Sequence, residues 1–405
     1  MSVIVSFFKH QNIKFYDALQ SLFMPLLLIF VFVRPFIGSL TAVKINFAYS
    51  ALLFLFLFCW ILFKKNPIKK DAVSWLLPLF FGSILVSWFI NKDSIAVNLH
   101  LFQYINGILL FLTARALTHK HKTGMILTLL ASGVCASLLA IHQYFFGFQN
   151  VANYLSEHNI IDPVARNCIL SRRVFAPFCT SNALGGFLAM LLPLAFSLKN
   201  RKWIALPLFL ALLLTQSVGA SLALLAVLII YLWQIRSTAR TGLLLAAFLL
   251  IGASVIFITR NVTPMPWFHP SFSIKMRLIY WEETLRLIQS HFWLGTGLGS
   301  FDLPSARYAH NSYLQLWAEN GLLGITAFLA LLIALFKSGM ANITARAETR
   351  FLLMGCGVFL LHNLIDFTFF LPETSLIWCV MFGLALNTSA PETGHAPAVV
   401  KKSFE

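Results

Sequence analysis

Long apolar stretches recur along the chain at a length that matches the thickness of a lipid bilayer. A helix rises 1.5 Å per residue, so about 20 mostly apolar residues cross the hydrocarbon core of a membrane. The pattern predicts twelve such helices. They cover residues 20–40, 45–63, 73–90, 96–117, 124–146, 183–198, 203–217, 218–235, 241–258, 321–337, 351–370 and 374–388.

The stretch from residue 203 to residue 234 is too long for one crossing and short for two. It is flanked by five basic residues, Lys199, Arg201, Lys202, Arg236 and Arg240. Short loops rich in Lys and Arg stay on the cytoplasmic side. An even number of crossings must therefore separate the two basic groups, and we expect two helices joined by a tight turn near residues 216–220.

Composition agrees with a membrane protein. The chain is 59% hydrophobic and only 11% charged, whereas soluble domains carry roughly 25% charged residues. Most of its 30 Lys and Arg residues fall in the loops predicted to be cytoplasmic, so the net charge of +16 reflects topology and not a nucleic-acid site. We expect an all-α integral membrane protein, a single polytopic domain over residues 1–405, with both termini in the cytoplasm.

Two external segments are much longer than the others, residues 147–182 and 261–320. Binding and catalytic residues are concentrated on loops that a rigid scaffold holds in place. Because the scaffold here is mostly Leu and Phe, we expect the chemistry to lie in these two segments, and the main catalytic motif in the second.

Cysteines and carboxylates restrict the kinds of site that are expected. Cys168 and Cys179 both fall in the first external segment, and an oxidising exterior favours a disulfide between them, although sequence alone does not give its geometry. Glu282 and Glu283 are neighbours on a predicted helix and point along different faces. The sequence shows no clustered metal ligands, and we expect neither a metal nor a cofactor.

The second external segment contains two predicted helices separated by glycines. The first covers residues 273–292, with Ser271 or Ser273 as its N-cap, and it ends before Gly295, Gly297 and Gly299. The second begins near residue 309 and closes at Gly321, which is suited to end a helix.

The run from His310 to Gly321, with the glycines before it, resembles the signature of the O-antigen ligase/polymerase superfamily. The run from Arg172 to Leu184 resembles the segment of the same family that enters a membrane span. One departure stands out: where relatives carry Ser-Arg-Gly, this chain has Ser217-Val218-Gly219.

The resemblance implies a membrane glycosyltransferase similar to those of the GT-C type, which use lipid-linked donors. An O-antigen ligase moves O-antigen from undecaprenyl diphosphate to the lipid A–core oligosaccharide in lipopolysaccharide biosynthesis. It works at the periplasmic face of the bacterial inner membrane, without a metal and with inversion at the anomeric carbon. Donor, acceptor and membrane lipids are the expected partners.

His310 is the expected catalytic base. A neutral imidazole can take a proton from a sugar hydroxyl, and the positive end of a helix that begins beside it disfavours the charged form. The alternative is a histidine at the membrane interface that bonds a loop carbonyl.

Arg277 is the first candidate ligand for a diphosphate, because guanidinium binds phosphate oxygens bidentately. Its neighbours at i+3 and i+4, Tyr280 and Trp281, are aromatic rings suited to a sugar face, and it has no acid within reach on its helix. Arg286, with Glu282 four residues before it, is instead expected to form a surface ion pair.

Arg172 and Arg173 are further candidates for the diphosphate, with Arg173 favoured; their alternative partners are lipid head groups. Asn182, Asn311 and Glu319 are expected either to support the site or to cap helices. His362 and Asp366, four residues apart on one helix, are candidates for a supporting position.

Other functions remain open from sequence. O-antigen polymerase and protein O-oligosaccharyltransferase belong to the same superfamily. A transporter of polysaccharide or lipid-linked glycan is the alternative from a different class, but transporters place their sites near the membrane midplane between repeats, and we find no repeat here.

Overall fold

The computed structural model describes residues 22–63, 71–92, 95–161, 169–198, 201–234, 252, 269–343 and 346–388. Within these ranges the chain forms helices and connecting loops, without a β-strand. For this part of the chain the all-α prediction is therefore confirmed.

Helices lie at eleven of the twelve predicted ranges. They are Leu22–Phe36, α2 (Val43–Phe63), α3 (Ala72–Ile90), α4 (Ile95–Arg115), α5 (His119–His142), α8 (Ser181–Ala195), α9 (Arg201–Thr215), α10 (Val218–Gln234), α13 (Ser312–Met340), α14 (Ala347–His362) and α15 (Pro372–Ala385). The predicted span 241–258 lies outside the described residues except for residue 252. The break between α9 and α10 at residues 216–217 confirms the turn that the charge pattern predicted.

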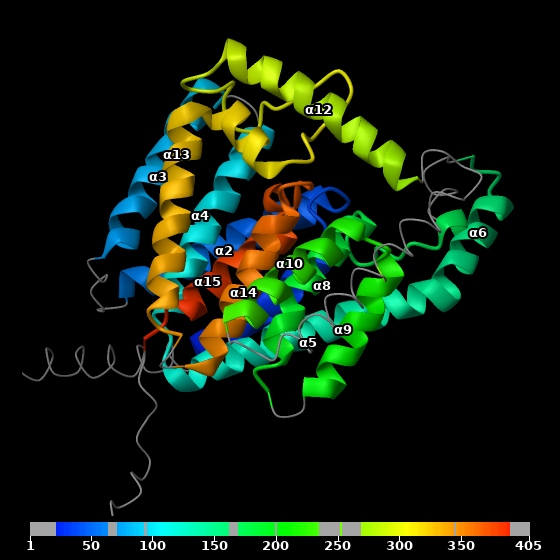
Figure 1. Cartoon of the computed structure of the whole chain (residues 1–405), viewed down its shortest axis with the longest axis horizontal. Helices are drawn as coiled ribbons and strands as arrows, with labels where there is room; N and C mark the ends of the chain where they lie inside the picture. The colour runs from blue at the N-terminus through cyan, green and yellow to red at the C-terminus, as the bar shows by residue number, and fades with distance from the viewer. Residues whose placement is uncertain are drawn as a thin grey trace, which may run out of the picture.

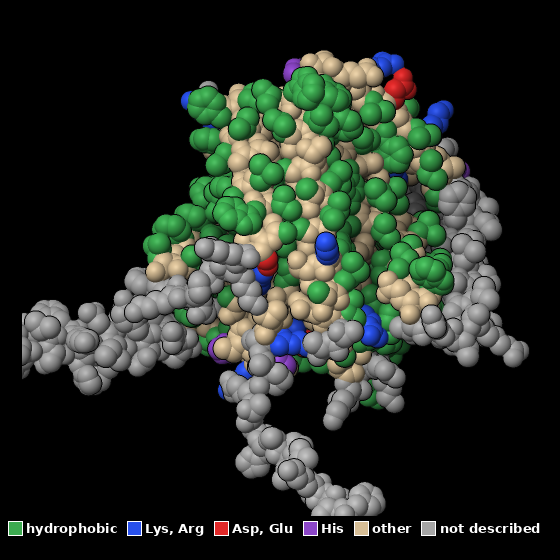
Figure 2. All heavy atoms as spheres, turned by 60° about the vertical axis from the view of Figure 1, so that its left-hand side comes forward, with side chains coloured by type: hydrophobic (Ala, Val, Ile, Leu, Met, Phe, Trp, Pro, Cys, Tyr) green, Lys and Arg blue, Asp and Glu red, His purple; other side chains and the backbone are tan. Residues whose placement is uncertain are grey.

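Five of the described helices are long and apolar enough to cross a membrane. They are Val43–Leu62, Ala72–Ile90, Val97–Arg115, His119–Glu157 and Ser312–Met340. Large apolar side chains also lie exposed on the surface, among them Trp75 and Ile333, which are 74% and 69% exposed. Figure 2 shows hydrophobic side chains over most of one face, with most of the visible Lys and Arg near its upper and lower edges. These are features of a multi-pass membrane protein, whereas the total of twelve crossings stays a prediction.

Two helices, α8 and α15, form the centre of the bundle, and nearly all of their residues are buried. α14 packs against both, and also against α10. Small residues allow this close packing, as is common between helices in membranes. A Cβ atom added at Gly186 of α8 would lie 2.6 Å from Nδ1 of His362 on α14. The glycine thus makes room for a buried polar side chain at the end of α14.

The two long segments that are predicted to be external contribute helices that do not belong to the bundle. α12 (Pro270–Ser290) lies across one end of the bundle (Figure 1) and packs against α13. On the other external segment, α5 continues through a π-helical turn, η2 (Gln143–Gly147), into α6 (Phe148–Glu157). A short 3₁₀ turn, η4 (Thr368–Phe370), joins α14 to α15.

The start of α12 differs from the prediction. The helix begins at Pro270, with His269 as its N-cap, rather than at Ser273 capped by a serine. Proline suits the first helical position because its fixed φ is already helical. The hydroxyl of Ser273 instead accepts a hydrogen bond from Arg277.

The glycine-rich loop and the helix after it agree with the prediction. Gly295, Gly297 and Gly299 all have positive φ, and the next helix begins at Ser312 with Asn311 as its N-cap. Gly321 (φ 66°) interrupts α13 and separates a short helix, residues 312–320, which is predicted to be external, from the longer apolar part.

Candidate functional site

A cavity of about 260 Å³ lies where four parts of the chain meet. These are the start of α8 with the residues before it, the first turn of α10, the N-terminal half of α12, and the end of α14 with the loop after it. The polar and charged side chains in its wall are Arg173, Asn182, Ser217, Ser273, Arg277, His362 and Asp366. Two arginines predicted from separate external segments thus line the same cavity.

Arg173 lies just before α8 and is held at two points. Its Nε donates to the carbonyl oxygen of Thr215 at 3.1 Å, and Nη2 donates to Oδ1 of Asn182 at 3.0 Å. Thr215 is the last residue of α9 and Asn182 lies in the first turn of α8. The guanidinium is therefore fixed between two helices at the cavity wall, and Asn182 positions it.

Arg277 projects from α12 toward the loop that follows α14. Its Nε donates to the carbonyl oxygen of Ile365 at 2.9 Å, and Nη1 donates to the hydroxyl of Ser273. Its Nη2 lies 3.9 Å from Oδ2 of Asp366. The sequence indicated no acidic partner on the helix itself, and the structure corrects the expectation of an unpaired arginine, because the partner comes from a distant part of the chain.

Asp366 connects the arginine to a histidine. Its side chain is buried, Oδ1 accepts from the backbone N–H of Phe367 at 2.8 Å, and Oδ2 lies 4.0 Å from Nε2 of His362. His362 is buried against Gly186 and Gly219. Two arginines facing one carboxylate leave this cavity with an excess of positive charge.

The first turn of α10 adds to that positive potential. Ser217, Val218 and Gly219 line the cavity, so the N-terminal end of a 17-residue helix faces it. Backbone N–H groups and the helix dipole at such an end favour anions. Val218 places an apolar side chain in this part of the wall.

Backbone strain concentrates around this cavity. Of the four described non-glycine residues with positive φ, Arg172, Gln216 and His310 lie next to or within the elements that build it. This conformation costs roughly 1–2 kcal/mol for an ordinary residue, and such strain tends to cluster at functional sites. The expected base is among the three.

His310 does not line the cavity itself; it lies just before α13, close enough for the charges of Arg277 and Asp366 in the cavity wall to act on it. Its ring stacks with Tyr280 of α12 at 5.8 Å between centroids and meets the edge of Phe367 at 4.9 Å. Burial lowers the pKa of His310, the nearby Asp366 carboxylate acts to raise it, and Arg277 lowers it further. The net effect favours the neutral imidazole, and its buried Nδ1 has no hydrogen-bond partner among the described residues.

Tyr280 and Trp281 occupy different places relative to the cavity. Trp281 lines it, and its buried indole N–H has no partner within the described chain. Tyr280 contacts His310 instead. Trp281 therefore shares the cavity wall with Arg277, whereas Tyr280 packs against His310.

Arg172 does not line the cavity. It is exposed, and its guanidinium lies 5.9 Å from the centre of the Tyr144 ring. Arg173, the favoured member of the pair in the sequence analysis, is the one that reaches the site. Arg286 forms the expected exposed pair with Glu282 at 2.6 Å.

Asn311 and Glu319 have structural contacts. The side chain of Asn311 accepts from the N–H groups of Tyr313 and Leu314 and so caps α13. Glu319 is buried and accepts from the N–H of Gly299 and from Gln315. Glu319 thus fixes the glycine loop to the short external helix and supports the region around His310 from a distance.

The predicted disulfide stays a prediction, because Cys168 lies outside the described residues. Cys179 is half-buried, and burial raises the pKa of its thiol to about 12. Among the described residues, no three His, Cys, Asp or Glu side chains lie together as metal ligands would. That the reaction needs no metal stays a prediction.

Sequence reasoning missed several groups that shape the site. Ser273 and the carbonyl oxygen of Ile365 orient Arg277, and Phe367 packs against His310. The carbonyl and the aromatic ring carry no sequence signal of a functional role. Ser273 does carry such a signal, because it lies four residues before Arg277 on the same helix, but from sequence we interpreted it as a possible helix cap.

Residues 203–329 match the family model described as O-antigen ligase. The match covers about a third of the chain, from α9 into α13, and includes Val218, Arg277 and His310. No curated protein and no solved structure gives a significant match. This match supports membership of the chain in the O-antigen ligase superfamily.

Proposed function

We propose that this protein is an O-antigen ligase. It transfers a glycan from undecaprenyl diphosphate to the lipid A–core oligosaccharide at the periplasmic face of the bacterial inner membrane. The family match supports an enzyme of the glycosyltransferase-like ligase and polymerase group. The ligase reaction, its inverting course and its independence of metal are the proposal.

The observation that carries the proposal is the convergence of Arg173 and Arg277 on one cavity beside His310. The arginines come from different external segments, and each is oriented by fixed hydrogen bonds. With the first turn of α10, they provide a cationic surface for a diphosphate, which is charged when bound and gains charge as it leaves.

The chemistry follows from these positions. His310 takes a proton from a hydroxyl of the acceptor sugar. The oxygen then forms a bond to the anomeric carbon of the donor while the bond from that carbon to the diphosphate oxygen breaks. Attack opposite to the leaving group inverts the anomeric centre. Arg173 and Arg277 stabilise the charge of the departing undecaprenyl diphosphate.

The neutral form of His310 is needed for the first step, and its surroundings favour it. Burial disfavours imidazolium, and Arg277 repels the added charge, so both lower the pKa of the base. Asp366 opposes this, which keeps the imidazole basic enough to accept a proton. The same carboxylate lies beside Arg277 and partly compensates the charge of the two arginines that line the cavity.

The direct test is reconstitution. Purified protein is incubated with undecaprenyl-diphosphate-linked glycan and rough lipopolysaccharide, with and without excess EDTA. The proposal predicts glycan attached to lipid A–core in both samples. Longer carrier-linked glycan with no lipopolysaccharide product would indicate a polymerase, and a requirement for a divalent ion would contradict the proposed mechanism.

A further inference from the structure

A short segment between α14 and α15, residues 363–369, is bonded to the turn that carries His310. The backbone N–H of Ser312, the first residue of α13, donates to the carbonyl oxygen of Asn363 at 2.9 Å. The hydroxyl of Ser312 lies 2.7 Å from Oδ1 of Asn363 and 3.1 Å from the carbonyl oxygen of Asp366, so its single proton is shared between two acceptors. These bonds are buried and join parts of the chain that are 51 residues apart in sequence.

Asn363 also stabilises the segment that it begins. Its Oδ1 accepts a second hydrogen bond, from the backbone N–H of Phe369 at 2.7 Å, and its Nδ2 donates to the carbonyl oxygen of Phe359 on α14 at 2.8 Å. The residue is only 1% exposed. An amide oxygen has two lone pairs, and here both are used. One buried side chain therefore connects the end of α14, the segment after it and the start of α13.

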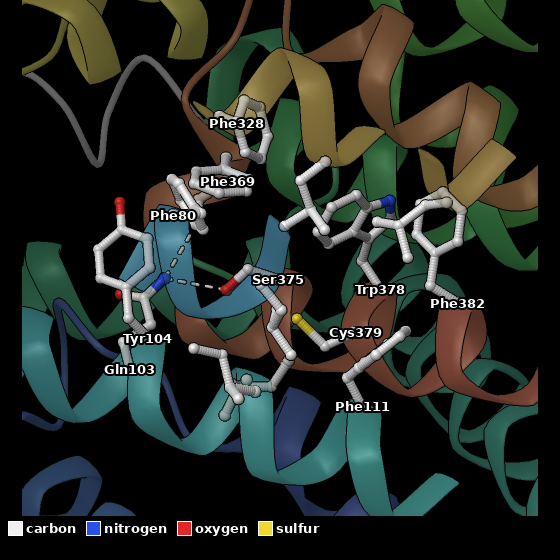
Figure 3. A pocket seen from close by; sticks show the side chains of 16 residues that line it. Phe80, Gln103, Tyr104, Phe111, Phe328, Phe369, Ser375, Trp378, Cys379 and Phe382 are labelled. Atoms are coloured by element: carbon white, nitrogen blue, oxygen red, sulfur yellow. Dashed lines mark hydrogen bonds between the residues drawn. The ribbon is translucent and has the colours of Figure 1, made fainter. Parts of the chain in front are cut away.

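The far end of the segment is fixed to the helix bundle. The carbonyl oxygen of Phe369 accepts from Nε2 of Gln103 on α4 at 3.0 Å, and the same nitrogen donates to the hydroxyl of Ser375 on α15 at 2.9 Å (Figure 3). The ring of Phe369 lies 5.2 Å from that of Phe328 on α13. With Asn363 at its start and these contacts at its end, the segment is held at both ends.

The segment borders both parts of the proposed catalytic machinery. Ile365 lines the arginine cavity, which is the cavity that Arg173 and Arg277 share, and its carbonyl oxygen accepts from Nε of Arg277. Phe367, two residues further on, meets the ring of His310 at 4.9 Å between centroids. The position of this segment therefore determines how the proposed base lies relative to the arginines.

His310 depends on the bonds around it, because its backbone has a φ of 49°, which is strained for a residue with a side chain. On the N-terminal side, the N–H of Ala309 donates to Oε1 of Gln315 at 3.3 Å. On the C-terminal side, Ser312 donates to Asn363. The first bond ties the turn to its own helix, and only the second ties it to the segment beside the arginine cavity.

The placement of the base should affect the chemical step more than donor binding. Displacement of a reacting group by about 1 Å can lower the rate roughly 10²-fold. Ser312 does not line the arginine cavity, and loss of its hydroxyl leaves the bonds of Asn363 to Phe369 and Phe359 in place. Loss of this hydroxyl should therefore reduce turnover and leave the groups that are proposed to bind the diphosphate unchanged.

We infer that Ser312 and Asn363 are positioning residues, which hold His310 in a fixed place relative to the segment 363–369 and, through it, to the arginine cavity. The inference rests on the proposed ligase function, in which His310 is the base. It assigns a role in the reaction to two buried side chains that do not line the proposed donor site.

The kinetic test is Ser312→Ala, which removes the hydroxyl and keeps the backbone bond to Asn363. We expect kcat for ligation to fall by roughly tenfold to 10²-fold, while the affinity for donor stays at the wild-type value. Ser132→Ala is the matched control. Ser132 is also buried, and its hydroxyl donates to the carbonyl oxygen of Phe32 at 2.9 Å, so the same kind of bond is lost away from the site. This control should leave kcat unchanged.

A double-mutant cycle separates positioning from a general loss of stability. If Ser312 acts through His310, Ser312→Ala should reduce the residual ligation of the His310→Ala protein far less than it reduces ligation by the wild type. An equal reduction in both backgrounds would overturn the inference. A loss of donor affinity in place of turnover, or an equal effect of Ser132→Ala, would do the same.

Hydrogen exchange keeps the inference separate from the ligase proposal, because it needs no substrate. In Ser312→Ala and in Asn363→Ala, amides of residues 305–316 should exchange faster than in the wild type, whereas Ser132→Ala should leave them unchanged. Unchanged exchange in the first two variants would overturn the positioning role even if ligation were confirmed. A wild-type protein that shows the exchange difference but no ligation would instead contradict the proposed function, and with it the role of these residues in ligation.

Discussion

Nη2 of Arg277 lies 3.9 Å from Oδ2 of Asp366. This distance is beyond a hydrogen bond, so the two groups interact through charge, while Nε and Nη1 of the guanidinium are bound to Ile365 and Ser273. The arginine is thus oriented by neutral groups, and its charge is only partly balanced by the carboxylate. Such an arrangement suits a side chain that must bind a diphosphate and then release it.

The same carboxylate should influence the pH dependence of the reaction. Because burial and Arg277 lower the pKa of His310, the base stays neutral at pH values where an ordinary histidine is protonated. Turnover should fall only when the pH drops below the usual pKa of histidine. Asp366→Asn removes the one influence that raises this pKa, so the acid limb of kcat/KM should move to still lower pH. A shift to higher pH would contradict the assignment of His310 as the titrating base.

Arg277 and Arg286 both lie on α12, so a substitution of Arg286 serves as the control for the same substitution of Arg277. Arg277→Ala should weaken donor binding, and Arg277→Lys should restore it only in part, because a point charge does not reproduce the bidentate fork. Arg286→Ala should leave both donor binding and turnover nearly unchanged, because its pair with Glu282 is exposed and such pairs contribute little. Binding of labelled donor to the three variants measures the difference; equal losses for the two alanine variants would contradict a specific role for Arg277.

The apolar pattern predicted the helices of this protein well, because a run of about 20 apolar residues has few alternatives to a membrane helix. The spatial arrangement of the residues in the long loops was harder to predict. Arg277 and Asp366 meet only because α12 lies across the end of the bundle, and no local pattern gives that arrangement. The choice between Arg172 and Arg173 likewise depends on a backbone turn at Arg172, which the sequence does not encode in a recognisable motif.

The close approach of His362 to Gly186, at the centre of the bundle, allows a test of how helix packing positions the site. Gly186→Ala would place its Cβ atom 2.6 Å from the ring of His362, so the histidine beside Asp366 would have to move. We expect a loss of about 1–3 kcal/mol in stability, as for other overpacked positions, together with reduced turnover. Gly82→Ala on α3 is the control, because nothing lies within 4 Å of the added atom. Equal thermal stability of the two variants in detergent would contradict the packing described here.

Val218 allows a test in which a cationic side chain is added to the cavity wall instead of being removed. The residue lines the arginine cavity in the first turn of α10, and from sequence it departs from the Ser-Arg-Gly that the family resemblance implies there. Val218→Arg should be tolerated and should tighten donor binding, since a third cation would face the diphosphate. The matched change Leu222→Arg, one turn further along the same cavity wall, should give a smaller gain because it lies farther from the helix end. Weaker donor binding in Val218→Arg would indicate that the diphosphate lies elsewhere.

The general-base role of His310 is tested most directly by His310→Ala in the reconstituted reaction, with donor binding measured on the same sample. The substitution removes the proton acceptor but leaves Arg173 and Arg277 in place. We predict that the variant folds and binds donor like the wild type, while ligation falls by at least ~10²-fold, the typical contribution of a general base. A folded His310→Ala protein that binds donor and ligates at the wild-type rate would contradict this account.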